Sequence, residues 1–310
     1  MRSMIDMDTV QIELTDACRN SCSNCTRFCG HRPRPFFMEM DFFKRAIDSM
    51  EGYPKMVGFQ GGEPLLHPNF EEMCNYARSK FPKEQLGLWT TLPSGLEKHR
   101  DVICKTFHHI FINDHSRSDV FHHPGLVAIE EVMPNDKGMM WYHIDHCWAQ
   151  MSWSASVNPK GAFFCEIAAA MSLLFNEEGG WPVEPGWWYR IPKDFKEQVD
   201  RYCPRCGFAA PLGRRASTEG IDDISPKNLD RIKYTSPKIA RGKYKVHNLR
   251  VNVNPEPMAS YKDFDYRNRI ASKYGMFLCI NEQNTWTPYL TTKEYKESIV
   301  PFDRIKERHK

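Results

Sequence analysis

Segments with the alternation of a β-strand and segments with the periodicity of a helix follow one another through residues 9–113. The strand patterns cover four short segments, 9–14, 56–60, 86–91 and 109–113. The helical patterns cover the three segments between them, 38–50, 70–81 and 97–107. This order predicts a parallel sheet with helices packed outside it, either a partial barrel or an open doubly wound sheet. Both architectures place reactive groups at the carboxyl ends of the strands.

Three cysteines lie at the first of these carboxyl ends. Cys18, Cys22 and Cys25 follow the first predicted strand, with three and two residues between them. Three thiolates on one loop can hold a small inorganic centre and leave one of its positions to another molecule. In a four-iron four-sulfur cluster, one iron would then lack a protein ligand. The alternative is a zinc site that borrows a fourth ligand, such as His31 or Cys29.

A glycine-rich segment, Gly61-Gly62-Glu63-Pro64, follows the second predicted strand. Neighbouring parallel strands would bring it beside the cysteine loop. Its glycines would permit a close approach of two backbones, and the Glu63 carboxylate could meet an ammonium group.

The run from Glu13 to Cys18, the cysteine spacing that ends at Cys25, and the Gly-Gly-Glu-Pro segment together resemble the radical S-adenosylmethionine (SAM) superfamily. The resemblance spans residues 9–145 and implies a partial (β/α)6 barrel. It implies a four-iron four-sulfur cluster that binds and reductively cleaves SAM, fed by an external electron donor such as flavodoxin or ferredoxin. The implied residues are Cys18, Cys22 and Cys25 for the cluster, and Gly61, Gly62, Glu63, Pro64 and Asn113 for SAM.

The cysteine loop also contains Asn24 and Cys29. Asn24 stands where this family often has an aromatic residue, and we expect Phe28 to take over part of that packing. Ligation by Cys29 would close the open iron, so we interpret Cys29 as a small buried residue.

A second group of four cysteines, Cys147, Cys165, Cys203 and Cys206, occurs later in the chain. A predicted hairpin over 153–164 delivers Cys165, a helix is expected over 166–175, and a Cys-x-x-Cys pair follows. This order resembles the twitch domain of radical SAM enzymes, a shortened SPASM domain, and implies one auxiliary four-iron four-sulfur cluster. The alternatives are a structural zinc held by the same thiolates, or four unrelated buried cysteines.

A radical on the substrate, a proton acceptor and an auxiliary electron acceptor together favour dehydrogenation. We expect a small polyhydroxylated substrate, such as a sugar or cyclitol. The alternatives are epimerisation with Cys279 or Cys29 as hydrogen donor, decarboxylation of a sugar acid, and peptide modification. His115 and Arg117, which follow the strand ending at Asn113, are the candidates for receiving a proton or binding a phosphate. The alternative is that both are ordinary loop residues.

We expect a barrel over residues 1–145, a twitch-type domain over 146–215 and an extension of unknown role over 216–310. The formal charge of +3 gives no general attraction for nucleic acid. No segment has the apolar length of a signal peptide or membrane span, so we expect a cytoplasmic protein with reduced thiols. The stretch 231–245 is basic and contains aromatic residues. A zinc-bearing nucleic-acid-binding protein is therefore a further alternative, although a solvated basic face is the simpler interpretation.

Overall fold

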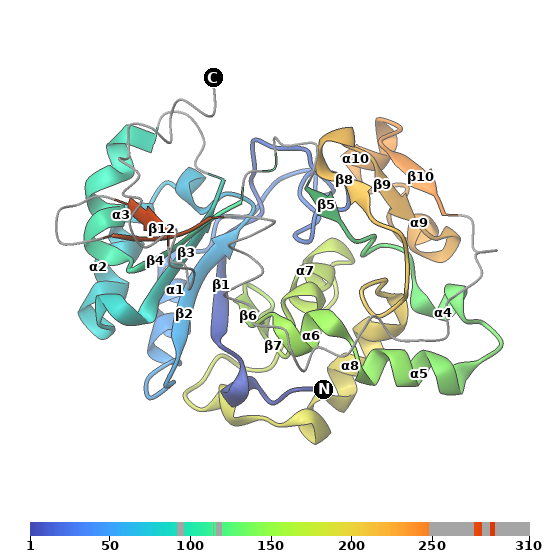
Figure 1. Cartoon of the computed structure of the whole chain (residues 1–310), viewed down its shortest axis with the longest axis horizontal. Helices are drawn as coiled ribbons and strands as arrows, with labels where there is room; N and C mark the ends of the chain where they lie inside the picture. Colours follow the sequence, from blue (N-terminus) through green and yellow to red (C-terminus); the bar gives the residue numbers. More distant parts are fainter. Residues whose placement is uncertain (92–95, 114, 116–119, 248–275, 281–285, 289–310) are drawn as a thin grey trace.

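A mixed sheet runs through the computed structural model, which describes residues 1–91, 96–113, 115, 120–247, 276–280 and 286–288 (Figure 1). The strand order is β12-β11-β4-β3-β2-β1-β6-β7. The strands are β1 (Thr9–Thr15), β2 (Met56–Gly61), β3 (Leu86–Thr90), β4 (His109–Ile112), β6 (Ala155–Asn158), β7 (Gly161–Phe163), β11 (Met276–Ile280) and β12 (Trp286–Pro288). The four strands predicted in the first part of the chain are therefore confirmed.

The centre of the sheet is parallel. Strand β1 pairs in parallel with β2 on one side and with β6 on the other, and β2, β3 and β4 continue the parallel part. Strands β7, β11 and β12 are antiparallel to their neighbours and form the two edges. The order reverses at β1, and in open α/β sheets ligands bind outside the strand ends at such a reversal.

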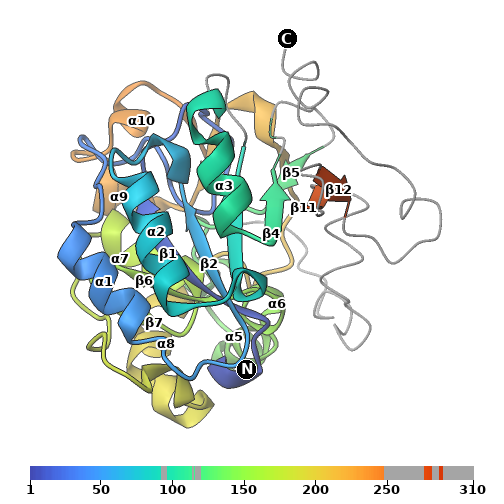
Figure 2. The same ribbon diagram turned by 90° about the vertical axis from the view of Figure 1, so that its left-hand side faces the viewer.

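Helices α1 (Met40–Asp48), α2 (Phe70–Lys80) and α3 (Arg100–Thr106) cover one face of the sheet (Figure 2). Their buried aromatic side chains pack on the strands. Phe59 of β2 meets Phe43 and Phe107 edge to face, with ring centroids 5.4 and 5.1 Å apart. This packing holds the strands that carry the cysteine loop and the glycine segment in one rigid layer.

The chain after β4 departs from a simple barrel. The next parallel strand, β6, lies beside β1 and not beside β4, so the described residues do not form six consecutive βα units. The partial-barrel prediction is thus confirmed as a mixed α/β fold with a mostly parallel sheet. The predicted hairpin is present as β6 and β7, and it continues this same sheet.

The remaining elements surround this sheet. The helices are α4 (Ile129–Val132), α5 (Lys137–Asp145), α6 (Trp148–Ser152), α7 (Glu166–Leu174), α8 (Lys196–Tyr202), α9 (Pro226–Ile232) and α10 (Pro237–Ala240). Two small sheets pair β5 (Phe121–His122) with β8 (Arg215–Ala216), and β9 (Asp222–Ile224) with β10 (Tyr244–Val246). Short 3-10 helices are η1 (Met4–Asp6), η2 (Pro64–Leu66), η3 (Lys83–Gln85), η4 (Leu96–His99), η5 (Trp187–Tyr189), η6 (Pro192–Phe195), η7 (Cys203–Arg205) and η8 (Ser217–Glu219).

Ser225 is the N-cap residue of α9 and Pro226 its first helical residue. The Ser225 side chain does not cap the helix, because its hydroxyl donates a hydrogen bond to the Glu131 carboxylate instead. This bond ties α9 to α4.

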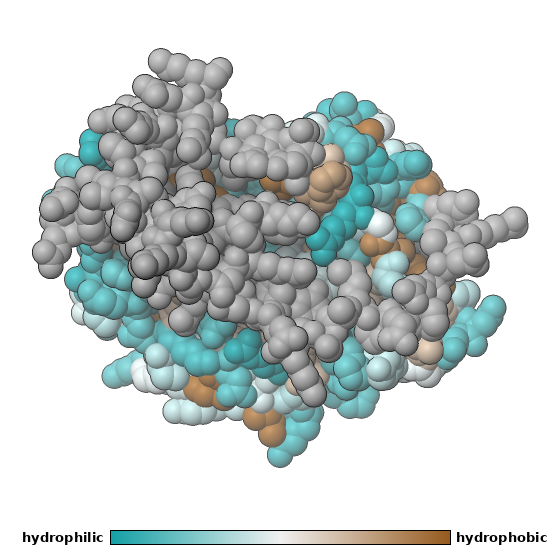
Figure 3. Space-filling model, in the orientation of Figure 1, coloured by the Kyte–Doolittle hydropathy of each residue, from teal (hydrophilic) through white to brown (hydrophobic). Residues whose placement is uncertain are grey.

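The described surface in the view of Figure 3 is mostly hydrophilic, with hydrophobic residues in small separate groups. None of the helices in the described ranges is both long enough and apolar enough to span a bilayer.

Candidate functional site

The loop between β1 and α1 carries the first cysteines and is closed at its base. The Asp16 carboxylate accepts a 2.7 Å hydrogen bond from the Phe36 amide and lies 3.3 Å from the Arg32 guanidinium. The Met38 amide donates to the Leu14 carbonyl at 2.8 Å. The two ends of the loop are thereby fastened to the end of β1, at the point where the strand order reverses.

The thiols of this loop lie close enough to influence one another. The Cys29 thiol is hydrogen-bonded to Cys25, and this bond holds the pKa of Cys25 well below its ordinary value. The pKa of Cys29 is raised by its hydrogen bonds to Cys18 and Cys25 and by burial. Burial, followed by the neighbouring Cys25 and Cys18, raises the pKa of Cys22. The structure therefore brings the three predicted ligands together and places Cys29, one of the two candidates for a fourth zinc ligand, against Cys18 and Cys25.

His31, the other candidate for a fourth ligand, is fully engaged elsewhere. Its Nε2 lies 2.7 Å from Asp222 Oδ2, and its Nδ1 lies 2.8 Å from Ser236 Oγ. Of the two candidates, Cys29 is therefore the one that faces the other thiols. Over the described ranges, no three His, Cys, Asp or Glu side chains form a group that could hold a metal ion.

The glycine segment lies directly against the cysteine loop, as predicted. The Gly62 amide donates to the Thr15 carbonyl and the Glu63 amide to the Ala17 carbonyl, both at 2.7 Å. A Cβ atom on Gly61 would lie 2.2 Å from the Thr15 oxygen, and one on Gly62 would lie 2.4 Å from the Ala17 oxygen. Glycine is therefore required at both positions for the two backbones to meet beside Cys18.

The Glu63 carboxylate is buried and joins the ends of two strands. It accepts hydrogen bonds from Thr90 Oγ1 at 2.7 Å, from the Thr91 amide at 2.8 Å and from Thr91 Oγ1 at 2.7 Å. The Leu65 amide adds a 3.2 Å bond. Burial raises the pKa of Glu63, and these hydrogen bonds oppose the rise. Glu63 thus holds the glycine segment against the end of β3, and the two threonines were not identified from the sequence.

His115 lies near the cysteine loop through a second histidine. His122 Nδ1 lies 2.7 Å from the Ser23 carbonyl oxygen, and its Nε2 lies 3.1 Å from His115 Nδ1. A carbonyl can only accept, so His122 carries its proton on Nδ1. When both rings are neutral, His115 donates from Nδ1 and holds its lone pair on Nε2. The sequence analysis assigned no role to His122.

The other two sequence candidates, Asn113 and Arg117, follow β4 in the chain. The Asn113 amide donates a 2.9 Å hydrogen bond to the Thr90 carbonyl, which places Asn113 at the strand ends beside the Glu63 contacts. Arg117 lies outside the described residues.

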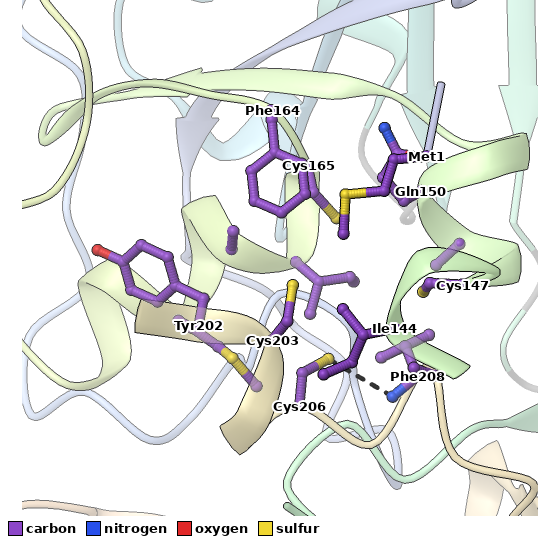
Figure 4. Close-up of a pocket in the computed structure, with 15 residues that line it drawn as sticks. Met1, Ile144, Cys147, Gln150, Phe164, Cys165, Tyr202, Cys203, Cys206 and Phe208 are labelled. Carbon is purple, nitrogen blue, oxygen red and sulfur yellow. Dashed lines mark hydrogen bonds between the residues drawn. The ribbon is translucent and has the colours of Figure 1, made fainter. Parts of the chain in front are cut away.

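The four later cysteines line one pocket (Figure 4). Cys147 comes from the turn between α5 and α6, Cys165 precedes α7, and Cys203 and Cys206 come from η7 and its end. The other lining residues are mostly apolar and are Met1, Ile144, Ala149, Gln150, Phe164, Ile167, Ala168, Met171, Tyr202, Phe208 and Ala209. Four thiols in an otherwise apolar pocket are a donor set that suits zinc or an iron–sulfur cluster.

Burial is the main influence on these thiols. It raises the pKa of Cys165 to about 12, and the backbone amides at the start of α7 partly oppose the rise. Burial also raises the pKa of Cys203, and the charges of Cys206, Cys147 and Cys165 add to the effect. With their pKa values raised, these thiols stay protonated unless a cation lies among them, so the set suits a metal centre only when the metal is bound.

A buried arginine connects the two cysteine sets. Arg27 follows Cys25 by two residues, and its guanidinium lies 3.4 Å from Glu166, the residue after Cys165. Arg27 also donates a hydrogen bond to Glu13 of β1, while Ser154 donates to Glu166 at 2.6 Å.

No family model matches the chain, and no curated protein sequence matches it. Two solved structures align with 64% of the chain at 14% sequence identity. One is BtrN in complex with AdoMet and 2-DOIA, with a TM-score of 0.43 over 92% of that chain. The other is SeMet BtrN in an open conformation, with a TM-score of 0.42 over 86% of that chain. Similarity at this level shows neither a ligand nor a reaction for this chain.

Proposed function

We propose that this chain is a radical SAM enzyme that oxidises a small polyhydroxylated substrate, such as a sugar or cyclitol. The observation that carries the proposal is the docking of the glycine segment on the cysteine loop. The amides of Gly62 and Glu63 bond to the backbone just before Cys18, so a molecule bound by the thiol-held centre would rest against this segment. A zinc knuckle would have no need for such a glycine-lined surface beside it.

The residues that would hold the cofactors follow from this arrangement. Cys18, Cys22 and Cys25 would hold the SAM-binding cluster, and the segment 61–64 with Asn113 would contact SAM. Cys147, Cys165, Cys203 and Cys206 would hold the auxiliary cluster. When bound, SAM and the two clusters supply the radical that removes a substrate hydrogen atom and the acceptor for the remaining electron.

The proton of the oxidised hydroxyl group must also leave. We assign its transfer to His115 Nε2, because the hydrogen bond that His115 Nδ1 donates to His122 orients the ring and fixes the tautomer. Loss of one hydrogen atom, one proton and one electron balances the oxidation of an alcohol to a ketone. Flavodoxin or ferredoxin would supply the electron that reduces the first cluster.

The cysteine layout resembles that of 2-deoxy-scyllo-inosamine dehydrogenase, which motivates the cyclitol class of substrate. A resemblance of layout leaves the choice of substrate open. Transfer of deuterium from labelled cyclitols and sugars into 5′-deoxyadenosine would identify it.

Iron and sulfide measurements after anaerobic reconstitution test the cluster assignment. The Cys18/Cys22/Cys25 triple alanine variant should lose about half of the iron and all SAM cleavage, since one of two equal clusters disappears. The alanine variant of the four later cysteines should lose the other half and keep SAM cleavage. Unchanged iron in the first variant would refute the proposal.

The second candidate is a zinc-bearing protein, and the position of Cys29 favours it. Four thiolates, from Cys18, Cys22, Cys25 and Cys29, would be a complete zinc site. Anaerobic purification separates the two functions, because an iron–sulfur protein is brown and a zinc protein is colourless.

A further inference from the structure

The segment 215–247, whose role the sequence did not indicate, is fastened to the first cysteine loop. The Asn24 amide donates to Asp222, the Asn24 side chain donates to Asp223 Oδ2 at 2.9 Å, and the Asp223 amide returns a 2.8 Å bond to Asn24 Oδ1. The Ser23 amide donates to the Ser217 carbonyl at 2.9 Å. The side chain of Asn24 acts here as donor and acceptor at once. An aromatic ring at this position could not replace it.

A completely buried lysine lies at the centre of this contact. Lys238 Nζ donates a 2.8 Å hydrogen bond to the Cys22 carbonyl and lies 2.8 Å from Asp222 Oδ2. The Lys238 side chain is 0% exposed and that of Asp222 is 3% exposed. An ammonium group removed from water is costly unless charge and hydrogen bonds compensate it. Of the two compensating groups, the Cys22 carbonyl belongs to the cysteine loop and the Asp222 carboxylate belongs to the segment 215–247.

His31 completes the contact through both of its ring nitrogens. Its Nδ1 lies 2.8 Å from the Ser236 hydroxyl oxygen, which also accepts a 3.2 Å bond from the Ile239 amide. His31 Nε2 donates to Asp222 at 2.7 Å. Lys238 and Asp222 thus form a buried ion pair beside Cys22, and Asp223 pairs separately with Arg215 at 2.6 Å.

A buried ion pair adds little stability over well-packed apolar side chains, so its retention needs another reason. Here Lys238 bonds to the backbone of Cys22, and its charge acts on the thiols of Cys22 and Cys25. Charge and hydrogen bonds around a cluster set its reduction potential, and groups behind the ligands orient them.

We propose that Lys238 and Asp222 are positioning residues for the centre held by Cys18, Cys22 and Cys25. Lys238 holds the Cys22 peptide in its ligating position, and the balance of the two charges sets the reduction potential of the cluster. The second part rests on the proposed function, whereas the first part concerns the loop itself.

Two variants with opposite charge effects test the potential. In the reconstituted full chain, Lys238→Met leaves Asp222 unbalanced and should shift the midpoint potential of the first cluster to more negative values. Asp222→Asn leaves Lys238 unbalanced and should shift it to less negative values. Lys245→Met, which removes an exposed lysine of β10, is the matched control and should leave it unchanged. Shifts of Lys238→Met and Asp222→Asn in the same direction, or no shift, would overturn the electrostatic role.

Hydrogen exchange on the full chain without added iron tests whether Lys238 holds the cysteine loop in place. Peptides covering residues 18–31 should exchange faster in Lys238→Met than in the wild type and in Lys245→Met, while peptides from β2 and β3 stay unchanged. If Lys238→Met loses protection throughout, Asp222→Asn decides, because it removes the charge that holds Lys238 and keeps the shape of the contact. Unchanged exchange in the loop of the deciding variant would overturn the holding role. A wild-type chain that binds no iron would overturn only the proposed function.

Discussion

Arg27 Nη2 lies 3.4 Å from Glu166 Oε1, and both side chains are more than nine-tenths buried. The pair joins the loop of the first cysteines to the helix that begins after Cys165. Glu13, at the end of β1, accepts a hydrogen bond from the same guanidinium. The Arg27 side chain therefore links the positions of the two cysteine sets.

Replacing Arg27 by methionine should lower the free energy of unfolding by about 3–5 kcal/mol, because two buried carboxylates lose their cation. Denaturant unfolding of the unreconstituted chain measures this value. The Glu13→Gln/Arg27→Met/Glu166→Gln variant removes both carboxylate charges as well and should recover part of the loss. A cost for Arg27→Met below about 1 kcal/mol, the range of surface ion pairs, would contradict the role of this contact.

Replacing Cys29 by serine distinguishes a centre held by three thiolates from a centre held by four. We expect Cys29→Ser to keep its iron and its SAM cleavage, because an open iron needs only the other three thiolates. Cys18→Ser should lose both. Cys104→Ser, in the buried face of α3, controls for the loss of a core cysteine. Equal iron loss in Cys29→Ser and Cys18→Ser would establish a closed site.

A methyl group at Gly62 should separate the glycine segment from the cysteine loop, because its Cβ would lie 2.4 Å from the Ala17 carbonyl oxygen. We expect Gly62→Ala to lower SAM cleavage at least tenfold and stability by about 1–3 kcal/mol. Gly213→Ala is the matched control, since a Cβ there meets no atom within 4 Å. Comparable cleavage rates in the two variants would argue against a SAM surface at this segment.

His123 should make stability depend on pH. Burial lowers its pKa from 6.5 to about 4, so the unfolded chain binds a proton between these values and the folded chain does not. The resulting stability is fully present above pH 6.5 and is lost as the pH falls towards 4, by about 3 kcal/mol in all. The free energy of unfolding of wild type and of His123→Gln is measured at several pH values. The difference between the two slopes against pH gives this contribution. Parallel slopes would mean that His123 titrates normally in the folded chain.

Replacement of His115 should slow substrate oxidation more than SAM binding. Loss of a general base lowers a rate by about 10²–10⁴-fold, so His115→Ala should lower kcat by that range with little change in the Kd for SAM. His122→Phe should have a smaller effect, because it only removes the orientation of the His115 ring. Single-turnover assays with a cyclitol or sugar substrate, once identified, measure both. Equal kcat in His115→Ala and wild type would assign the base elsewhere.

The local part of this architecture was accessible from sequence alone. Strands β1 to β4 and helices α1 to α3 follow from the spacing of apolar residues, and the cysteine loop follows from the separation of three residues. The meeting of the glycine segment and the loop was predictable too, because neighbouring parallel strands end at one edge of a sheet.

Contacts between distant segments needed the tertiary structure. Lys238 touches the Cys22 backbone across 216 residues, and Arg27 reaches Glu166 through the interior. Strand β6 pairs with β1 and not with β4, a choice of neighbour that the order of strands along the chain does not decide. Periodicity and spacing describe how a segment relates to its own neighbours in the chain. The packing of whole helices and strands decides which buried charged groups lie together. The physical reason is that a charged group removed from water by the fold needs a partner at that place.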